Sequence, residues 1–208
     1  MRRPACLAVT AAFAAIASLG CAVYPGTARP ASVEDLRGEE GWILLDSVPY
    51  VPQVSDKGCG AACLAMVFRH WGIETQVEAL EEEFGDPVHE GIRASALRDA
   101  ARRRGLSAYL FAGTAADLEH ELSRGRPVVV GLAKPHDEGF TSHFEVVVGL
   151  HPAQQRIAAL DPGIGLTCDS LTGFENEWMP TKGVMLVVFV PEPEVASAKP
   201  AGPIGGVR

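Results

Sequence analysis

Residues 49–72 have the sequence PYVPQVSDKGCGAACLAMVFRHWG, which carries the strongest structural signal in the chain. An extended, proline-bounded segment comes first and contains Gln53. A helix pattern then begins at Cys59 and ends at Trp71-Gly72, because glycine commonly follows the last helical turn. Glycines on both sides of Cys59 let another backbone approach the thiol closely. We therefore expect Cys59 at the accessible N-terminus of a helix.

The composition of the whole chain is that of a globular protein. Of its 208 residues, 47% are hydrophobic and 21% are charged, which excludes disorder throughout and collagen-like repeats. The 18 Lys and Arg residues against 26 Asp and Glu residues give a net charge of -8. Proteins that bind a phosphate backbone carry a basic patch, so this balance argues against a nucleic-acid partner. Five cysteines are too few for a disulfide-built scaffold.

The start of the chain has the pattern of an export signal. Two arginines precede an apolar segment of small residues, Leu7 to Leu19, which is too short to span a bilayer comfortably. The segment ends in Ser18-Leu19-Gly20-Cys21, which resembles the lipobox of bacterial lipoproteins. In that family the cysteine thiol receives a diacylglyceryl group and the new N-terminus is acylated, with chains such as palmitate. We expect a signal peptide at residues 1–20 and lipid attachment at Cys21, with ordinary secretion as the alternative.

These signals divide the chain into four parts. After the signal peptide, residues 21–41 are rich in proline and glycine and predict a lipidated cysteine followed by a flexible tether. Residues 42–190 are expected to form a single folded domain, and residues 191–208, with four prolines, a disordered tail. Because Ala22 rather than aspartate follows Cys21, the lipoprotein resemblance implies anchoring at the periplasmic side of the outer membrane.

Helix patterns occupy the first half of the domain and strand patterns the second. After the helix that begins at Cys59, Thr75 and Ser95 can cap two further helices, and residues 114–123 predict a short fourth one. Residues 151–155 supply a hairpin turn. Helices followed by strands predict an α+β fold with an antiparallel sheet. The expected strands are the β-branched runs Val128–Val130, His143–Leu150, Arg156–Leu160 and Val184–Val190.

Two conditions make a cysteine a good nucleophile. The reacting form is the thiolate, and a thiol's pKa falls at a helix N-terminus or beside a histidine. Cys59 meets the first condition. Of the six histidines, only His143 begins a buried-looking strand, directly after the polar loop of residues 137–142. A strand end that points into a cleft is a suitable place for a general base, so His143 is the expected partner of Cys59.

The turn at residues 151–155 predicts a third member of this group. If the flanking strands pair around about position 153, residue 143 lies opposite about position 163, close to Asp161 at the end of the partner strand. The Asp161 carboxylate would then accept the imidazole N–H of His143 and fix its tautomer. Gln53, six residues before Cys59, is the candidate hydrogen-bond donor to an oxyanion. These residues have the order and roles of a papain-like cysteine hydrolase.

The motifs match one known family along most of the domain. They are residues 49–53, residues 58–66 with Trp71-Gly72, residues 143–149 and Leu160-Asp161-Pro162. Together they resemble the peptidase family of bacteriocin-processing ABC exporters, whose domains cut leader peptides after a double glycine. The resemblance implies a papain-like fold in which N-terminal helices pack on an antiparallel sheet. It also implies site roles, namely Cys59 as nucleophile, His143 as base, Asp161 as the residue that orients the base, and Gln53 as oxyanion donor.

Two features depart from that family. The exporter peptidases commonly have aspartate directly before the cysteine, where this chain has Gly58. No exporter membrane domain or P-loop follows, so we expect no nucleotide partner and a resemblance to the stand-alone lipoprotein members. The expected function is a membrane-anchored cysteine peptidase that hydrolyses a peptide or protein substrate after Gly-Gly or small residues, without a cofactor.

Several alternatives stay open at this point. A non-catalytic peptide-binding module on the same fold, or acyl transfer to an amine by the same residues, could replace hydrolysis. Cys63, four residues after Cys59, is expected to lie in the core. The two cysteines could instead suggest a metal site, but metal-binding cysteine pairs usually have two intervening residues. Their side chains would also point poorly for a disulfide. We therefore expect no bound metal.

Overall fold

The structure is a computed structural model that describes residues 26–85, 91–136 and 139–191. The expected signal peptide and its neighbouring Cys21 lie outside the described residues, as does the expected tail beyond its first residue. Among the described residues, no helix combines the length and the apolar character needed to cross a membrane.

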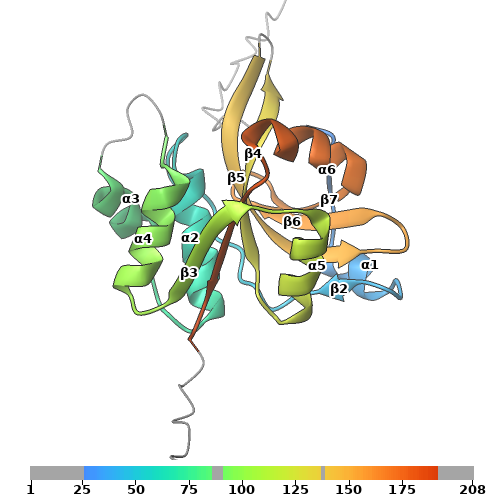
Figure 1. Ribbon diagram of the computed structural model, residues 1–208, viewed down its shortest axis with the longest axis horizontal. Coiled ribbons are helices and arrows are strands. Elements are labelled where there is room, and N and C mark those ends of the chain that lie inside the picture. Colours follow the sequence, from blue (N-terminus) through green and yellow to red (C-terminus); the bar gives the residue numbers. More distant parts are fainter. Residues whose placement is uncertain (1–25, 86–90, 137–138, 192–208) are drawn as a thin grey trace, which may run out of the picture.

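The described residues contain one eight-stranded sheet, in which every neighbouring pair of strands is antiparallel (Figure 1). The order across the sheet is β1-β7-β6-β5-β4-β8-β3, and β2 pairs with β5 outside this path. The expected α+β architecture is therefore confirmed. The strands are β1 (Arg29–Pro30), β2 (Ile43–Leu44), β3 (Ser107–Ala112), β4 (Val128–His136), β5 (Gly139–His151), β6 (Arg156–Asp161), β7 (Gly165–Ser170) and β8 (Val184–Phe189).

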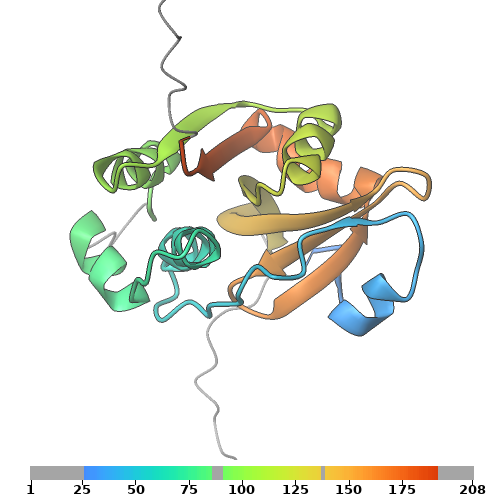
Figure 2. The ribbon, with the colours of Figure 1, turned by 90° about the horizontal axis from the view of Figure 1, so that it is seen from below.

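Helices pack on the sheet in two groups (Figure 2). One group is α2 (Cys59–His70), α3 (Val77–Phe84) and α4 (Ala94–Arg103), and the other is α5 (Ala115–Ser123) and α6 (Leu171–Trp178). A short α1 (Val33–Arg37) and a 3-10 turn (Met179–Thr181) complete the described helices. Alternate strand residues supply both groups, since Val129 packs with the α2 group, and Val128 and Val130 with the α5–α6 group. The sheet therefore separates two apolar cores.

The helix expected at Cys59 is α2, and its limits are confirmed. It begins at Cys59 and ends at His70, just before Gly72, which has a φ of +75°. Every residue from Ala61 to Phe68 has an exposed fraction of 0%. A helix that is apolar on every side has to be covered on every side. This requirement explains why the sheet, α3 and α4 surround α2.

Two expected helix caps are wrong. α3 begins two residues after Thr75, and α4 begins one residue before Ser95. Thr75 is instead buried at 9% exposure, and its carbonyl oxygen accepts hydrogen bonds from the Arg69 guanidinium on α2. The hydrogen bonds from α2 thus hold Thr75 in the connection between the two helices, and α3 begins after it.

The prediction of a flexible tether over residues 21–41 is wrong from Arg29 onward, because this part of the chain is folded. β1 pairs with β7, and the Ser32 hydroxyl accepts a hydrogen bond from the Asp35 N–H at the start of α1. Leu36 of α1 is only 2% exposed. Without β1, the edge strand β7 would present unpaired backbone groups, and this pairing satisfies them. The segment is therefore part of the folded domain, despite its proline and glycine content.

The buried Leu36 distinguishes a docked segment from a flexible one. We expect Leu36→Ala to lower the free energy of unfolding by about 2 kcal/mol, because truncation removes buried apolar surface and leaves a cavity. Urea unfolding followed by circular dichroism measures this change. Glu34→Ala, at an exposed position of the same helix, is the matched control and should change stability by less than about 0.5 kcal/mol. Equal stability of Leu36→Ala and the unmodified chain would contradict the docking of α1.

Candidate active site

Cys59 is the first residue of α2 and is half-buried. Ahead of it, the Gly58 N–H donates to the Ser55 carbonyl at 3.0 Å, and the Gly58 carbonyl accepts the Ala62 N–H at 3.0 Å. These bonds fix the turn that leads into the helix. The N–H groups of a first helical turn lack partners within the helix and point outward. The thiol therefore lies where backbone donors and the positive end of the helix dipole favour negative charge.

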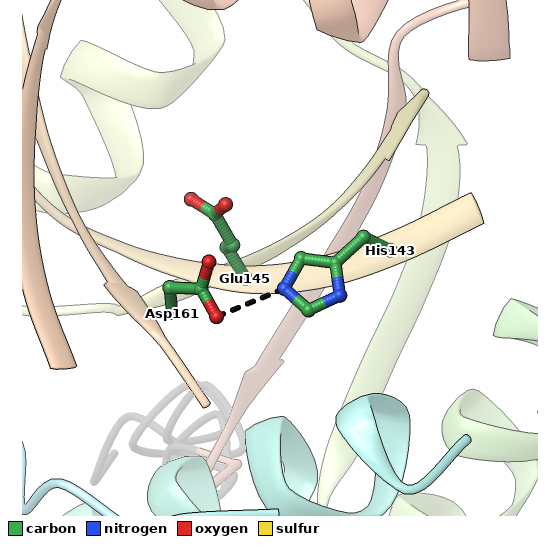
Figure 3. Close-up of side chains that lie close together, drawn as sticks. All are labelled: His143, Glu145 and Asp161. Atoms are coloured by element: carbon green, nitrogen blue, oxygen red, sulfur yellow. Dashed lines mark hydrogen bonds and ion pairs between the residues drawn. The ribbon is translucent and has the colours of Figure 1, made fainter. Parts of the chain in front are cut away.

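His143 and Asp161 are joined by a hydrogen bond between neighbouring strands. The His143 Nε2 atom lies 3.0 Å from Asp161 Oδ1 (Figure 3). His143 lies on β5 and Asp161 is the last residue of β6, where Val146 pairs with Leu160. The same Oδ1 atom accepts the Gly163 N–H at 2.7 Å. This juxtaposition is the one that the hairpin turn predicts.

The charge states of this pair follow from their surroundings. Burial lowers the pKa of His143, but hydrogen bonds to Asp161 and Cys59 outweigh it and raise that pKa from 6.5 to about 10. Burial raises the pKa of the Asp161 carboxyl, but the hydrogen bond and charge of His143 hold it below its ordinary value. Since Nε2 faces Asp161, Nδ1 is the ring nitrogen left for the thiol. The arrangement therefore favours the imidazolium form of His143.

Gln53 belongs to a loop that is attached to the turn after Asp161. Its backbone N–H donates to the Pro162 carbonyl at 3.0 Å, and the Tyr50 hydroxyl donates to the same oxygen at 3.1 Å. The Gln53 Oε1 atom is buried and has no hydrogen-bond partner among the described residues. The loop before α2 and the end of β6 thus hold one another in place, although they are far apart in the sequence.

Gly58 occupies the position directly before Cys59, where the exporter peptidases commonly have an aspartate. A β-carbon at residue 58 would collide with the carboxylate of Glu81 on α3 and would lie 3.1 Å from Ser55 Oγ. A side chain at this position would therefore require the Glu81 side chain of α3 to move. A carboxylate still lies beside the residue that precedes Cys59, but α3 supplies it.

The remaining described cysteines do not share the environment of Cys59. Cys63 is fully buried, and burial first, then the nearby Cys59 charge, raise the pKa of its thiol well above the ordinary value. It is therefore a protonated core residue, as expected. Cys168 is half-buried on β7, with its Sγ atom 3.3 Å from an Arg156 guanidinium nitrogen. These three cysteines are free thiols.

The residue that sequence reasoning missed is Glu145. It lies two positions after His143 on β5, and ligand atoms of Glu145, His143 and Asp161 all lie within 4.8 Å of one another. The sequence did contain a signal for Glu145. Side chains along a strand alternate between its two faces, so residues 143 and 145 lie on the same face. Nε2 of His143 already bonds Asp161, and Glu145 already pairs with the Lys134 ammonium. We therefore assign no metal ion to this trio.

A largely apolar pocket of about 300 Å³ borders His143. It lies between the start of α4 and the strands β4 and β5. Its lining residues include Ile92, Leu132, Phe144 and Val184 beside His143. A hollow of this size and lining can accept a small apolar group next to the reacting centre.

The raised pKa of His143 makes stability depend on pH. Because the folded-state pKa is about 10 and the ordinary value 6.5, its contribution is complete below about pH 6.5 and declines as pH rises to about 10. We expect the difference in unfolding free energy between the unmodified chain and His143→Gln to shrink across this interval in urea unfolding. His120→Gln, at an exposed position of α5, is the matched control for the loss of an imidazole. A constant difference for His143→Gln would contradict the assignment.

Comparison with known proteins places this geometry in a family. Residues 47–192 match the model of the Peptidase C39 family. The chain is 29% identical over 150 residues to the lactococcin-G-processing and transport ATP-binding protein LagD of Lactococcus lactis, covering 72% of this chain and 19% of LagD. It is 34% identical over 131 residues to the transport/processing ATP-binding protein ComA of Streptococcus pneumoniae, covering 62% and 17%. The chain thus spans about a fifth of the length of these curated relatives.

Solved structures show the same fold. A C39-like peptidase from Bacillus anthracis aligns with a TM-score of 0.59 at 20% identity, covering 71% of this chain and 97% of that one. The peptidase domain of Streptococcus ComA aligns with a TM-score of 0.55 at 24% identity, covering 67% and 98%. A double glycine motif protease from an AMS/PCAT transporter, in complex with its leader peptide, aligns with a TM-score of 0.55 at 23% identity, covering 68% and 91%. The papain-like fold expected from the sequence is confirmed, and the chain belongs to the Peptidase C39 family of cysteine peptidases.

Proposed function

We propose that this chain hydrolyses peptide bonds of a peptide or protein, with Cys59 as nucleophile, His143 as acid and base, Asp161 as the residue that orients His143, and Gln53 as oxyanion donor. One observation carries the proposal. The His143 imidazole bonds Asp161 through Nε2 at 3.0 Å, and Cys59 at the start of α2 is close enough to contribute to the raised pKa of that imidazole. Nucleophile, base and orienting carboxylate therefore form one connected set.

The first half of the reaction forms an acyl-enzyme. The thiolate of Cys59 attacks the scissile carbonyl carbon, a C–S bond forms, and the carbonyl electron pair moves to oxygen. The Gln53 carboxamide and the Cys59 backbone N–H donate to this oxyanion. The imidazolium of His143 then gives its proton to the leaving nitrogen as the C–N bond breaks, and the amine product departs.

The second half releases the acyl group. Neutral His143 takes a proton from a water molecule, whose oxygen attacks the thioester carbon. The C–S bond breaks, the electron pair returns to sulfur as thiolate, and the carboxylic acid product leaves. Asp161 keeps its charge throughout and stabilises the imidazolium each time it forms. The low pKa of the Asp161 carboxyl and the high pKa of His143 suit these roles.

The chemistry of the substrate is proposed from two sources. The names of the relatives describe processing of lactococcin G by LagD and a leader peptide bound to a double glycine motif protease. The hollow of about 300 Å³ beside His143 leaves room for a small residue near the reacting pair. We therefore propose cleavage after Gly-Gly or other small residues.

The proposed role of Gln53 has a kinetic signature. We expect Gln53→Ala to lower kcat by about 10²–10³-fold with a smaller change in KM, because an oxyanion donor acts mainly on the transition state. The substrate is a fluorogenic peptide with Gly-Gly before the cut, and Cys59→Ala sets the zero of activity. Cys168→Ser, which removes a half-buried thiol on β7, is the matched control and should keep full activity.

The products of the same assay separate hydrolysis from its alternatives. Cleavage by Cys59→Ala would overturn the mechanism. Binding of the peptide without cleavage by the unmodified chain would favour a docking module, and products joined to an added amine would favour acyl transfer.

We further propose that Cys21 anchors the chain to a bacterial membrane, at the periplasmic side of the outer membrane. The support is the small residue followed by cysteine at the end of an apolar segment. Acyl chains contribute about 0.8 kcal/mol per buried methylene group, so several chains would hold the protein lastingly.

Replacement of Cys21 tests the anchor. We expect Cys21→Ser to move the protein from the membrane fraction to the soluble fraction and to abolish incorporation of labelled palmitate. Cys168→Ser is again the matched control and should stay in the membrane fraction. A Cys21-containing mature protein with an unmodified N-terminus, seen by mass spectrometry, would contradict the proposal.

A further inference from the structure

Three buried charges lie behind the His143–Asp161 pair. The Lys134 ammonium on β4 lies 2.6 Å from Glu145 Oε1 on β5 and 2.8 Å from Glu177 Oε2 on α6. Lys134, Glu145 and Glu177 have exposed fractions of 1%, 2% and 5%. We call these three residues the buried ionic cluster.

The buried ionic cluster is costly for the fold. Each charge loses its hydration, and replacement of buried ion pairs by apolar residues is often neutral or stabilising. The two glutamates also share a single lysine. Burial and the nearby Asp161 raise the pKa of the Glu145 carboxyl, although Lys134 opposes this rise. Stability alone therefore does not account for Glu145.

Glu145 is the member of the cluster that reaches the active site. It lies two residues beyond His143 on the same strand. One of its carboxylate oxygens lies within 4.8 Å of a ring nitrogen of His143 and of a carboxylate oxygen of Asp161. Figure 3 shows the Glu145 carboxylate turned away from the hydrogen bond that joins Asp161 to His143. Glu177 does not belong to this group of close atoms. Its Oε1 atom accepts the Thr27 N–H at 3.1 Å instead.

Two consequences follow from a second carboxylate beside Asp161. If Glu145 were free to turn, it would repel Asp161 as an anion or donate a proton to it as an acid, and either would weaken the bond to His143. Held by Lys134, it cannot do so. Its negative charge then stabilises the imidazolium through a poorly solvated interior, where Coulomb interactions are strong.

We propose that Lys134 and Glu145 are positioning residues of the active site, in which Lys134 holds Glu145 away from Asp161 and the charge of Glu145 keeps His143 protonated. The functional meaning of this inference rests on the proposed peptidase mechanism. The described charged and titratable groups around His143 come from every element packed near it. The strands contribute Glu145 (β5), Asp161 (β6) and Lys134 (β4). The helices and loops contribute Cys59 and Cys63 (α2), Glu177 (α6), Tyr50 (the loop before α2) and Arg93 (just before α4).

The chain itself supplies a matched pair of variants. Glu145→Gln and Glu177→Gln each remove one carboxylate charge from the same lysine at similar burial, but only Glu145 lies beside His143. We expect the titration midpoint of His143, followed by NMR of ¹⁵N-labelled histidine, to fall by about one pH unit in Glu145→Gln. In Glu177→Gln it should stay within about 0.3 pH units of the unmodified chain.

Kinetics on the Gly-Gly peptide give the second readout. Loss of the imidazolium sets the alkaline limb of kcat/KM, so this limb should move to lower pH in Glu145→Gln by the same amount as the NMR midpoint. We expect kcat to be nearly unchanged at neutral pH, where both chains keep the imidazolium, and to fall by up to about tenfold above the midpoint, with KM within about twofold because substrate contacts are unchanged. Glu177→Gln should leave the limb in place.

The two readouts separate failure of this inference from failure of the proposed function. An unchanged His143 midpoint in Glu145→Gln, or equal shifts in both variants, would overturn the inference whether or not the peptide is cleaved. A shifted midpoint in a chain that cleaves no peptide would support the electrostatic role and count against the peptidase. If Glu145→Gln does not fold, Glu145→Met removes the same charge with an apolar side chain of similar size and leaves the Lys134–Glu177 pair intact. The midpoint should fall there too, and an unchanged midpoint would overturn the inference.

Discussion

The complete burial of α2 is the constraint on which the rest of the structure depends. A run of eight residues with 0% exposure, Ala61 to Phe68, can be satisfied only when other elements cover every side of the helix. The sheet covers one side, and α3 and α4 cover the others. The helix cannot slide or rotate without opening this core. Its N-terminus, and with it Cys59, is therefore held near the part of the sheet where β5 and β6 carry His143 and Asp161.

The second determinant of the site is charge in a poorly hydrated interior. His143 and Asp161 sit next to a buried carboxylate, and the Lys134 ammonium lies 2.6 Å from that carboxylate. In such surroundings one displaced charge changes the protonation of its neighbours more than it would at a surface. The Glu145 carboxylate is paired with Lys134. This pairing is consistent with a site in which residues outside the reacting group also influence the protonation of His143.

The comparison with the exporter peptidases shows how one local position can be filled differently. Where those domains commonly carry aspartate before the cysteine, this chain has Gly58, and Glu81 of α3 occupies the adjacent space. A neighbouring helix thus supplies a carboxylate to a place that a local side chain could have reached. The departure therefore leaves the start of α2 close to an acidic group.

The sequence by itself determined the local features of this protein. The limits of α2, the antiparallel α+β architecture and the approach of His143 to Asp161 all follow from periodicity, glycine placement and one hairpin turn. Each depends on residues that are neighbours in the chain or are joined by a short turn, so local rules suffice.

Only the tertiary structure decided the features that join distant segments. The polar run that forms β7 gains its pairing from β6 and β1, and the proline-rich segment around Leu36 folds because β7 offers a free edge. Thr75 lies in the connection between α2 and α3, where its carbonyl oxygen accepts hydrogen bonds from Arg69 of α2. The sequence contained no sign of the buried ionic cluster, because lysine and glutamate side chains are usually exposed and nothing local marks Lys134, Glu145 or Glu177 as buried. Strand pairing and the packing of α6 bring them together, and burial then gives their charges an effect that no local pattern encodes.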